Sequence, residues 1–117
     1  MSLKDYIREK EETSWKKYHD TIWDGTKIYI VDGDYVRSNI ANKKENGIDF
    51  VEGGHDLVYD LIPKGEIWVE HMINDHDEKM NMLHEIYEHT LMKHMKMPYE
   101  EAHNDTQTVE RAIREKE

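Results

Sequence analysis

The sequence predicts a single α+β domain over residues 1–117, with an N-terminal helix, a small antiparallel sheet and a C-terminal helical hairpin. The length of 117 residues fits one domain and leaves no room for two ordinary ones. Short β-branched and aromatic runs lie in the middle of the chain, whereas long stretches of helix-forming residues lie toward both ends.

The N-terminal segment is predicted to form an amphipathic helix over residues 3–22. It contains no glycine or proline, and its large apolar residues recur at loosely helical spacing. These residues are Leu3, Ile7, Trp15, Tyr18 and Ile22. The Asp24-Gly25 pair is a turn signal, so the helix should end there.

Three apolar runs are predicted to be strands, at residues 27–31, 48–52 and 66–70. The second run is expected to stop at Gly53-Gly54. Because the runs are short and close together, an antiparallel sheet is favoured over a parallel sheet, which needs crossover helices.

Polar turn residues separate these runs. Asp32 can cap a short helix over residues 35–41, and residues 42–47 are typical of a loop. Pro63-Lys64-Gly65 predicts a turn before the third strand.

Two helices are predicted at the C-terminal end. Asn74 or Asp75 can cap a long helix over residues 76–96, whose acidic residues come early and whose lysines come late, as the helix dipole favours. Pro98 interrupts it and suits the first turn of a last helix, over residues 98–115.

Composition excludes several classes of function. The chain has no cysteine, which excludes disulfides, thiolate metal sites and thiol catalysis. The formal net charge of −10 argues against a nucleic-acid partner, because phosphate binding needs a basic surface. No apolar run is long enough to span a membrane, and we expect a cytoplasmic protein.

The segment Leu83-His84-Glu85-Ile86-Tyr87-Glu88-His89 is the strongest candidate for chemistry. His84 and Glu88 are four residues apart and share one face of a helix, so together they can hold one cation. Glu85 points about 100° away and can act on a bound water without being a ligand. This is the logic of the metallopeptidase helix H-E-x-x-H, with Glu88 as the second zinc ligand.

A helical wheel that starts at Met80 places His84 inside a predicted core-facing arc and Glu88 at its margin. The arc consists of Thr90, Leu83, His94, Tyr87, Met80, Leu91, His84 and Met95. His89 is the rival second ligand, but it falls behind this arc and would need a π-bulge to join His84.

The third metal ligand is predicted in the last helix. His103 shares a face with Glu110, and that face should pack on the preceding helix. We favour His103 as the ligand, with Glu110 as the alternative or as the partner that orients an imidazole.

Other candidates are weaker. Gly53-Gly54-His55-Asp56 could place His55 near a ligand, but a glycine turn is the plainer account of that segment. Asp32-Gly33-Asp34 lacks the remainder of a calcium loop. His71 and His76 lie near a helix start and fit capping or solvated roles, and a stripe of methionines fits core packing.

The sequence also resembles a family of small uncharacterised proteins, seen in phages, prophages and microbial genomes, that look like minimal zincins. The resemblance rests on Ile28–Arg37, Asp49–His55, Ile62–Trp68, the His84-Glu85-x-x-Glu88 motif, Tyr99-x-x-Ala102-His103 and Glu110. It implies His84, Glu88 and His103 as metal ligands, Glu85 as the general base, and the strand around Trp68 as the edge strand beside the cleft. The chain departs from typical zincins in having Glu88 in place of a histidine.

The leading hypothesis is a zincin-like zinc hydrolase that acts on a peptide or protein substrate, with Glu85 as the catalytic base. The alternative is a non-catalytic acidic interaction protein whose His-Glu cluster is an ion-pair network or a vestigial site. A third hypothesis is a structural metal site that ties the last two helices together.

Overall fold

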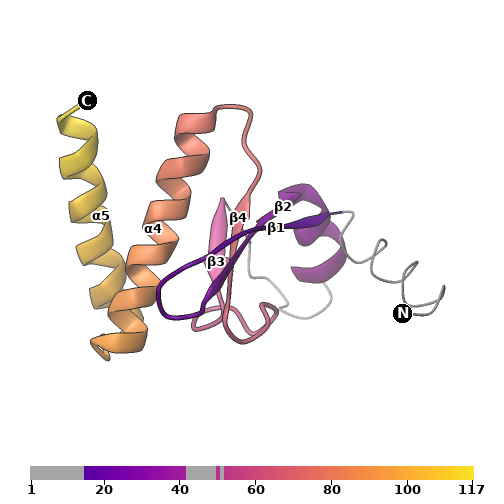
Figure 1. The fold of residues 1–117 in the computed structure, drawn as a ribbon, viewed down its shortest axis with the longest axis horizontal. Coiled ribbons are helices and arrows are strands. Elements are labelled where there is room, and N and C mark those ends of the chain that lie inside the picture. The colour runs from indigo at the N-terminus through magenta and orange to yellow at the C-terminus, as the bar shows by residue number, and fades with distance from the viewer. Residues whose placement is uncertain (1–14, 42–49, 51) are drawn as a thin grey trace.

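A computed structural model describes residues 15–41, 50 and 52–117, with backbone only at Ala41, and forms an α+β fold with a mixed sheet. The strands are β1 (Lys16–Thr21), β2 (Lys27–Val31), β3 (Gly53–His55) and β4 (Glu66–Glu70). The helices are α2 (Gly33–Tyr35), the π-helix η1 (Val36–Ala41), α4 (Asp75–His94) and α5 (Tyr99–Glu115). Helix α4 packs beside the sheet, and α5 packs beside α4 as a helical hairpin (Figure 1).

The sheet has the order β1-β2-β4-β3, and the prediction of an all-antiparallel sheet is wrong. β2 pairs with β4 in parallel, whereas the two outer pairings, β1 with β2 and β3 with β4, are antiparallel. The residues between β2 and β4 include α2, η1 and β3, which is enough chain for the crossover that a parallel pairing needs.

The predicted helix over residues 3–22 is wrong for its C-terminal part, because residues 16–21 form β1. The rest of that segment, up to residue 14, lies outside the described residues. Asp24-Gly25 makes the turn of a β1–β2 hairpin, with Gly25 at φ 88°, a conformation that favours glycine. The aromatic and β-branched residues near this turn fit a strand as well as a loose helical stripe, and pairing with β2 decides between the two.

The glycines predicted to end the second strand belong to β3 itself. Residues 48, 49 and 51 of the predicted strand lie outside the described residues. A Cβ on Gly54 would come within 2.6 Å of the Tyr59 ring, and one on Gly53 would come 3.1 Å from the Trp68 carbonyl oxygen. The glycines therefore allow other groups to approach the strand closely.

β4 has the predicted bounds but not the predicted place, because it is an inner strand. Its two edges pair with β2 and β3, so the expected edge strand around Trp68 has no free edge for a peptide. Ile67 and Val69 pack on the α4 side of the sheet with Ile28, while Trp68 packs in a second apolar cluster with Phe50. Burial on both faces explains why β4 is a continuous apolar run.

The C-terminal helices follow the predicted bounds to within two residues. The Asn74 side chain accepts hydrogen bonds from the backbone N–H groups of His76 and Asp77, which caps α4 as predicted. Pro98 immediately precedes α5. Asp32 caps α2, so the predicted short helix begins at Gly33 and continues as η1. The loop predicted at residues 42–47 lies outside the described residues.

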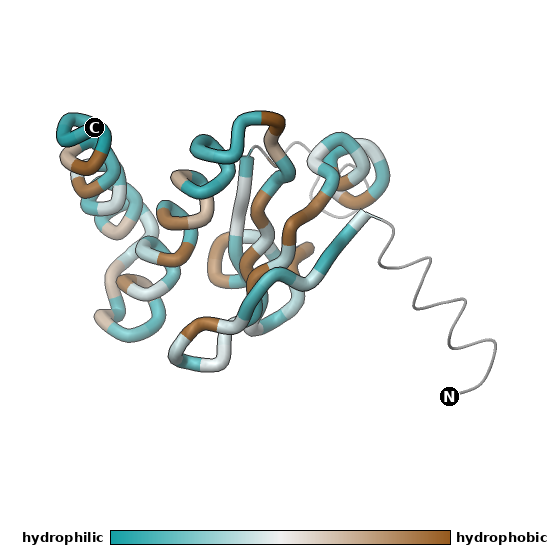
Figure 2. Tube along the Cα trace, turned by 45° about the horizontal axis from the view of Figure 1, so that its top comes forward, coloured by the Kyte–Doolittle hydropathy of each residue, from teal (hydrophilic) through white to brown (hydrophobic). Residues whose placement is uncertain are grey.

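Helix α4 uses two faces, and the predicted core arc is not the one against the sheet. Leu83 is 50% exposed and, with Met80 and Tyr87, lines a groove against α5. The sheet side carries Met82 and Ile86. Figure 2 shows hydrophobic stretches along the inner strands of the sheet and a mixture of hydrophobic and hydrophilic residues along α5. No described helix is long and apolar enough to cross a membrane.

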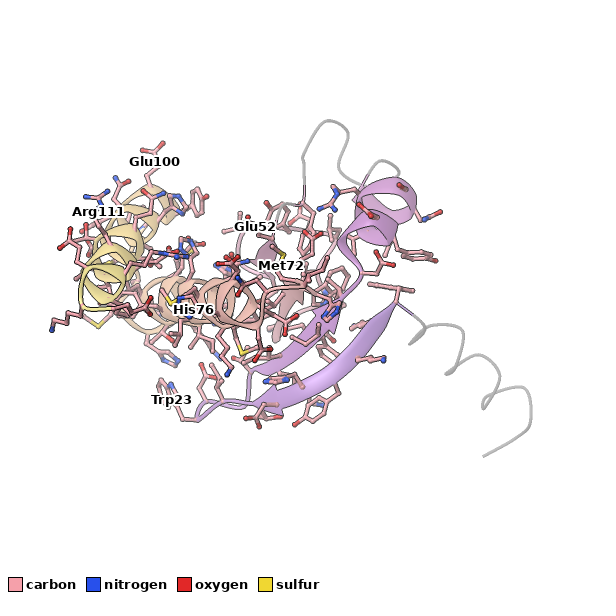
Figure 3. All side chains as sticks on the ribbon, turned by 90° about the horizontal axis from the view of Figure 1, so that it is seen from above. Trp23, Glu52, Met72, His76, Glu100 and Arg111 are labelled. Atoms are coloured by element: carbon pink, nitrogen blue, oxygen red, sulfur yellow. The ribbon has the colours of Figure 1, made fainter. Side chains whose placement is uncertain are left out.

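The hairpin turn also contacts the C-terminal end of α4. The Asp24 carboxylate accepts a hydrogen bond from His94 Nε2 at 2.8 Å and lies 3.3 Å from Lys93 Nζ. The Trp23 ring, at the tip of the hairpin (Figure 3), lies 4.7 Å from the His94 ring, measured between centroids. Burial opposes ionisation of Asp24, but its hydrogen bonds outweigh burial and hold its pKa well below the ordinary value.

A partly buried ion pair fixes η1 to the sheet. Arg37 donates two hydrogen bonds of 2.9 Å to the Glu70 carboxylate and another to the Phe50 carbonyl oxygen. These bonds from Arg37 hold the pKa of Glu70 below its usual value.

Replacing Arg37 with Met is expected to lower the free energy of unfolding by about 2 kcal/mol near neutral pH, because hydrogen bonds to a charged group contribute about 1.5–3 kcal/mol. A depressed carboxyl pKa stabilises the fold above the unfolded pKa of 4.5, and this stabilisation is lost as pH falls through the folded pKa. Urea unfolding from about pH 6 to about pH 3 should therefore show the two proteins converging in stability.

The matched control is Lys79→Met. Lys79 forms an exposed pair with Asp75, so its loss should change stability by about 0.5 kcal/mol or less. A gap between wild type and Arg37→Met that widens in acid would contradict the prediction.

Candidate metal centre

One carboxylate, that of Glu88, joins histidines from three elements. Glu88 is 3% exposed on α4. Its Oε1 accepts a hydrogen bond from Nε2 of His55 in β3 at 2.9 Å, and its Oε2 accepts one from Nδ1 of His103 in α5 at 2.8 Å. Nε2 of His84, one helical turn before Glu88, lies 3.3 Å from the same Oε2.

The structure brings together the three residues predicted as metal ligands. His84, Glu88 and His103 each offer one ligand atom, and these atoms lie within 4.8 Å of one another. Tetrahedral zinc ligands at about 2.0–2.1 Å from the ion lie roughly 3.3–3.4 Å from each other. The His84 Nε2 contact to Glu88 Oε2, at 3.3 Å, is of this size, whereas the His103 Nδ1 contact, at 2.8 Å, has the length of a hydrogen bond. This group of side chains could therefore hold a metal ion, and coordination itself stays a prediction.

Glu110 contacts the ring nitrogen of His84 that points away from Glu88. Its Oε2 accepts a hydrogen bond from His84 Nδ1 at 2.9 Å, and its Oε1 lies 3.3 Å from Arg114 Nη2. A carboxylate that accepts the N–H of one imidazole nitrogen leaves the other nitrogen free to bind a metal. Of the two roles considered for Glu110, its contacts fit the orienting one.

Glu85 lies close to the same group. Glu85, Glu88 and His55 also offer ligand atoms within 4.8 Å of one another. The Glu85 side chain packs against β3, where a Cβ on Gly53 would come 3.0 Å from Glu85 Cγ. Burial, reinforced by the charge of Glu88, raises the pKa of Glu85 to about 8.

The pKa values of Glu88 and His84 are also shifted by their contacts. Burial would raise the pKa of Glu88, but hydrogen bonding to His55, His84 and His103 outweighs it and holds that pKa well below the ordinary range. The neighbouring Glu88 carboxylate raises the pKa of His84 to about 9, against the effect of burial and with support from Glu110. Protons and a cation would therefore compete for His84.

A polar cavity of about 300 Å³ opens on this centre. Its wall carries four glutamates, at positions 52, 85, 88 and 110, and three histidines, at positions 55, 84 and 103. No lysine or arginine lines it among the described residues. Figure 3 shows Glu52 near α4, whereas Glu100 and Arg111 project from the outer side of α5. The cavity is therefore suited to a cation or a basic ligand.

Two histidines lie where the sequence did not place them. His55, expected beside a simple glycine turn, is fully buried in β3 and bonds Glu88. His89, considered as the rival ligand, is buried and bonds Asp56 at 2.8 Å, away from the His84 group. His71 and His76 lie outside the centre and pair with Glu78 and Glu117. Only the pairing of β3 with β4 beside α4 places His55, so no local pattern would have found it.

Comparison with protein-family models, with curated proteins and with solved structures finds no match to this chain. Function must therefore be inferred from the geometry of the site.

In protein stripped of metal with a chelator, Glu88→Gln is expected to lower the free energy of unfolding by about 3 kcal/mol near neutral pH. A neutral amide would leave the surrounding imidazoles without their anion, and breaking a buried pair costs about 3–5 kcal/mol. Urea denaturation followed by tryptophan fluorescence measures the change. Glu100→Gln, exposed on α5, is the control and should have almost no effect. A loss below about 1 kcal/mol would mean that Glu88 does not hold the three elements together.

Proposed function

We propose that this chain is a zinc-dependent hydrolase of the zincin-like kind that acts on a peptide or protein. The observation that carries the proposal is the convergence of His84, Glu88 and His103 at a polar cavity that Glu85 also lines. Three protein ligands beside an accessible cavity are the arrangement of catalytic zinc sites, whereas structural sites are closed by four.

Each residue has a distinct role in this proposal. His84, Glu88 and His103 would hold the zinc ion, which when bound would supply Lewis-acid polarisation of an amide carbonyl and would acidify water. Glu85 accepts a proton from the attacking water and delivers it to the leaving amine. Glu110 fixes the orientation of His84 through the 2.9 Å contact to Nδ1. A divalent cation beside Glu85 would favour its ionised form, which a base needs.

The substrate would approach along β3, which is an edge strand of the sheet and contacts α4. Gly53 and Gly54 of β3 line the cavity, and strand addition at a sheet edge is a common mode of peptide binding. β3 thus takes the role expected of the strand around Trp68. The acidic wall of the cavity favours peptides with basic side chains.

One observation favours the alternative of a non-catalytic acidic interaction protein. Glu88 already contacts three imidazoles, so the cluster satisfies its buried carboxylate as an ion-pair network without a cation. A measurement of zinc binding distinguishes this alternative from the proposal. A variant that keeps zinc but loses hydrolysis would distinguish a catalytic ion from a purely structural one.

Replacing His103 with Gln is expected to remove one equivalent of zinc from the protein, because a ligand of the centre is lost. His84→Ala should have the same effect. Elemental analysis of untagged protein after dialysis against zinc measures the change. His76→Gln, an exposed histidine at the start of α4, is the control and should keep the wild-type content. Wild-type zinc content in both His103→Gln and His84→Ala would contradict the ligand assignment.

Glu85→Gln is expected to keep this zinc equivalent and to lower the rate of peptide hydrolysis by about 100-fold or more, because a positioned general base contributes about 10²–10⁴-fold. Cleavage of a peptide library rich in lysine and arginine, followed by mass spectrometry, measures the rate. Glu101→Gln, exposed on α5, is the control and should cleave like wild type. Full activity in Glu85→Gln would exclude Glu85 as the base.

A further inference from the structure

A second group of metal-ligating side chains lies beside the first, on the other side of His55. His55, Asp56 and His89 each offer one ligand atom, and these atoms lie within 4.8 Å of one another. The two imidazole rings meet edge to face, with centroids 5.0 Å apart. Of the described residues that line the polar cavity, His55 is the only member of this group. The group therefore meets the cavity only at His55, and its other two members lie behind the cavity wall.

Both histidines leave one ring nitrogen without a partner. His55 is 0% exposed and His89 is 1% exposed. Within the described residues, neither Nδ1 atom has a hydrogen-bond partner, although both are buried. An unpaired buried polar group costs about 1–3 kcal/mol, so two of them side by side need a physical account.

The opposite nitrogen of each ring is held by a carboxylate. His55 Nε2 bonds Glu88 Oε1 at 2.9 Å, and His89 Nε2 bonds Asp56 Oδ1 at 2.8 Å. Asp56 is itself fixed, because its Oδ2 accepts a hydrogen bond from the backbone N–H of Gly65 at 3.0 Å. An imidazole whose N–H is bound by a carboxylate presents a lone pair on its other nitrogen, as metal-binding histidines do.

We propose that His55, Asp56 and His89 form a second site for a divalent cation of the zinc type, enclosed between the end of β3 and α4. His55 would contribute Nδ1, His89 a ring nitrogen and Asp56 a carboxylate oxygen. Such donors suit zinc and related transition metals. An ion bound there would tie the strand to the helix.

The two sites share one contact but do not compete for a ligand atom. Glu88 faces the first site with Oε2 and orients His55 through Oε1. Occupation of the second site would therefore hold β3 against α4 while leaving the cavity open. This proposal does not require that the chain be a hydrolase, and it adds an ion to the one assigned above.

The test is a zinc titration of the chelator-stripped full chain, followed by native mass spectrometry. We expect two zinc ions in wild type, one in His89→Gln, one in His103→Gln and none in the double variant. His76→Gln is the control and should keep both ions. Asp56→Asn, which retains an oxygen for the Gly65 N–H, should weaken the second equivalent at least tenfold.

A spectroscopic measurement on wild type covers the case in which a variant fails to fold. In histidine ¹⁵N spectra, the Nδ1 resonance of His55 and one ring-nitrogen resonance of His89 should shift on addition of the second zinc equivalent. The proposal is overturned if these resonances do not respond to zinc, or if His89→Gln folds and binds as many ions as wild type. An error in the assignment of the first site would give a different result, because His103→Gln would then bind as many zinc ions as wild type.

Discussion

The burial of one carboxylate, that of Glu88, is the constraint on which the arrangement of this protein depends. A carboxylate that is 3% exposed would be costly without compensating partners. Those partners come from the edge strand β3, from α4 itself and from α5. Because the buried Glu88 carboxylate needs these partners, it fixes how α5 and the edge strand β3 pack against α4.

The candidate metal centre is acidic, as is the chain as a whole. The formal net charge is −10, and the cavity wall gathers four glutamates within the space that α4, α5 and β3 enclose. Histidines offset that negative charge inside the protein, and the orienting contact from Glu110 to His84 extends the network to α5. Four of the 26 acidic residues of the chain thus lie where a cation would be stabilised.

Local signals in the sequence were sufficient for the parts of the fold that local chemistry determines. The Asn74 cap, the break at Pro98 and the apolar run of β4 each depend on neighbouring residues, so their bounds were predictable. The strand β1 was not, because its residues suit two periodicities and only pairing with β2 selects one. The parallel pairing of β2 with β4 is likewise a long-range property.

In the candidate site, too, some residues are positioned by local helical spacing and others by long-range pairing. Helical spacing brings His84 beside Glu88, and the amphipathic face of α5 brings His103 to them, so these three were accessible to sequence reasoning. His55 reaches Glu88 across 33 positions of the chain through a strand pairing that no local pattern encodes. The helical wheel misplaced His89, because it assumed one buried face where α4 has two.

The contact of Asp24 with His94 affects how much conformational entropy α4 loses when a ligand binds. Helix α4 is capped at its start by Asn74 and held at its far end by the tip of the β1–β2 hairpin. A segment fixed at both ends has little freedom left to lose when something binds to its middle. The residues around Glu88 are therefore preorganised, and an incoming ion or molecule would not have to bear the cost of ordering the helix that receives it.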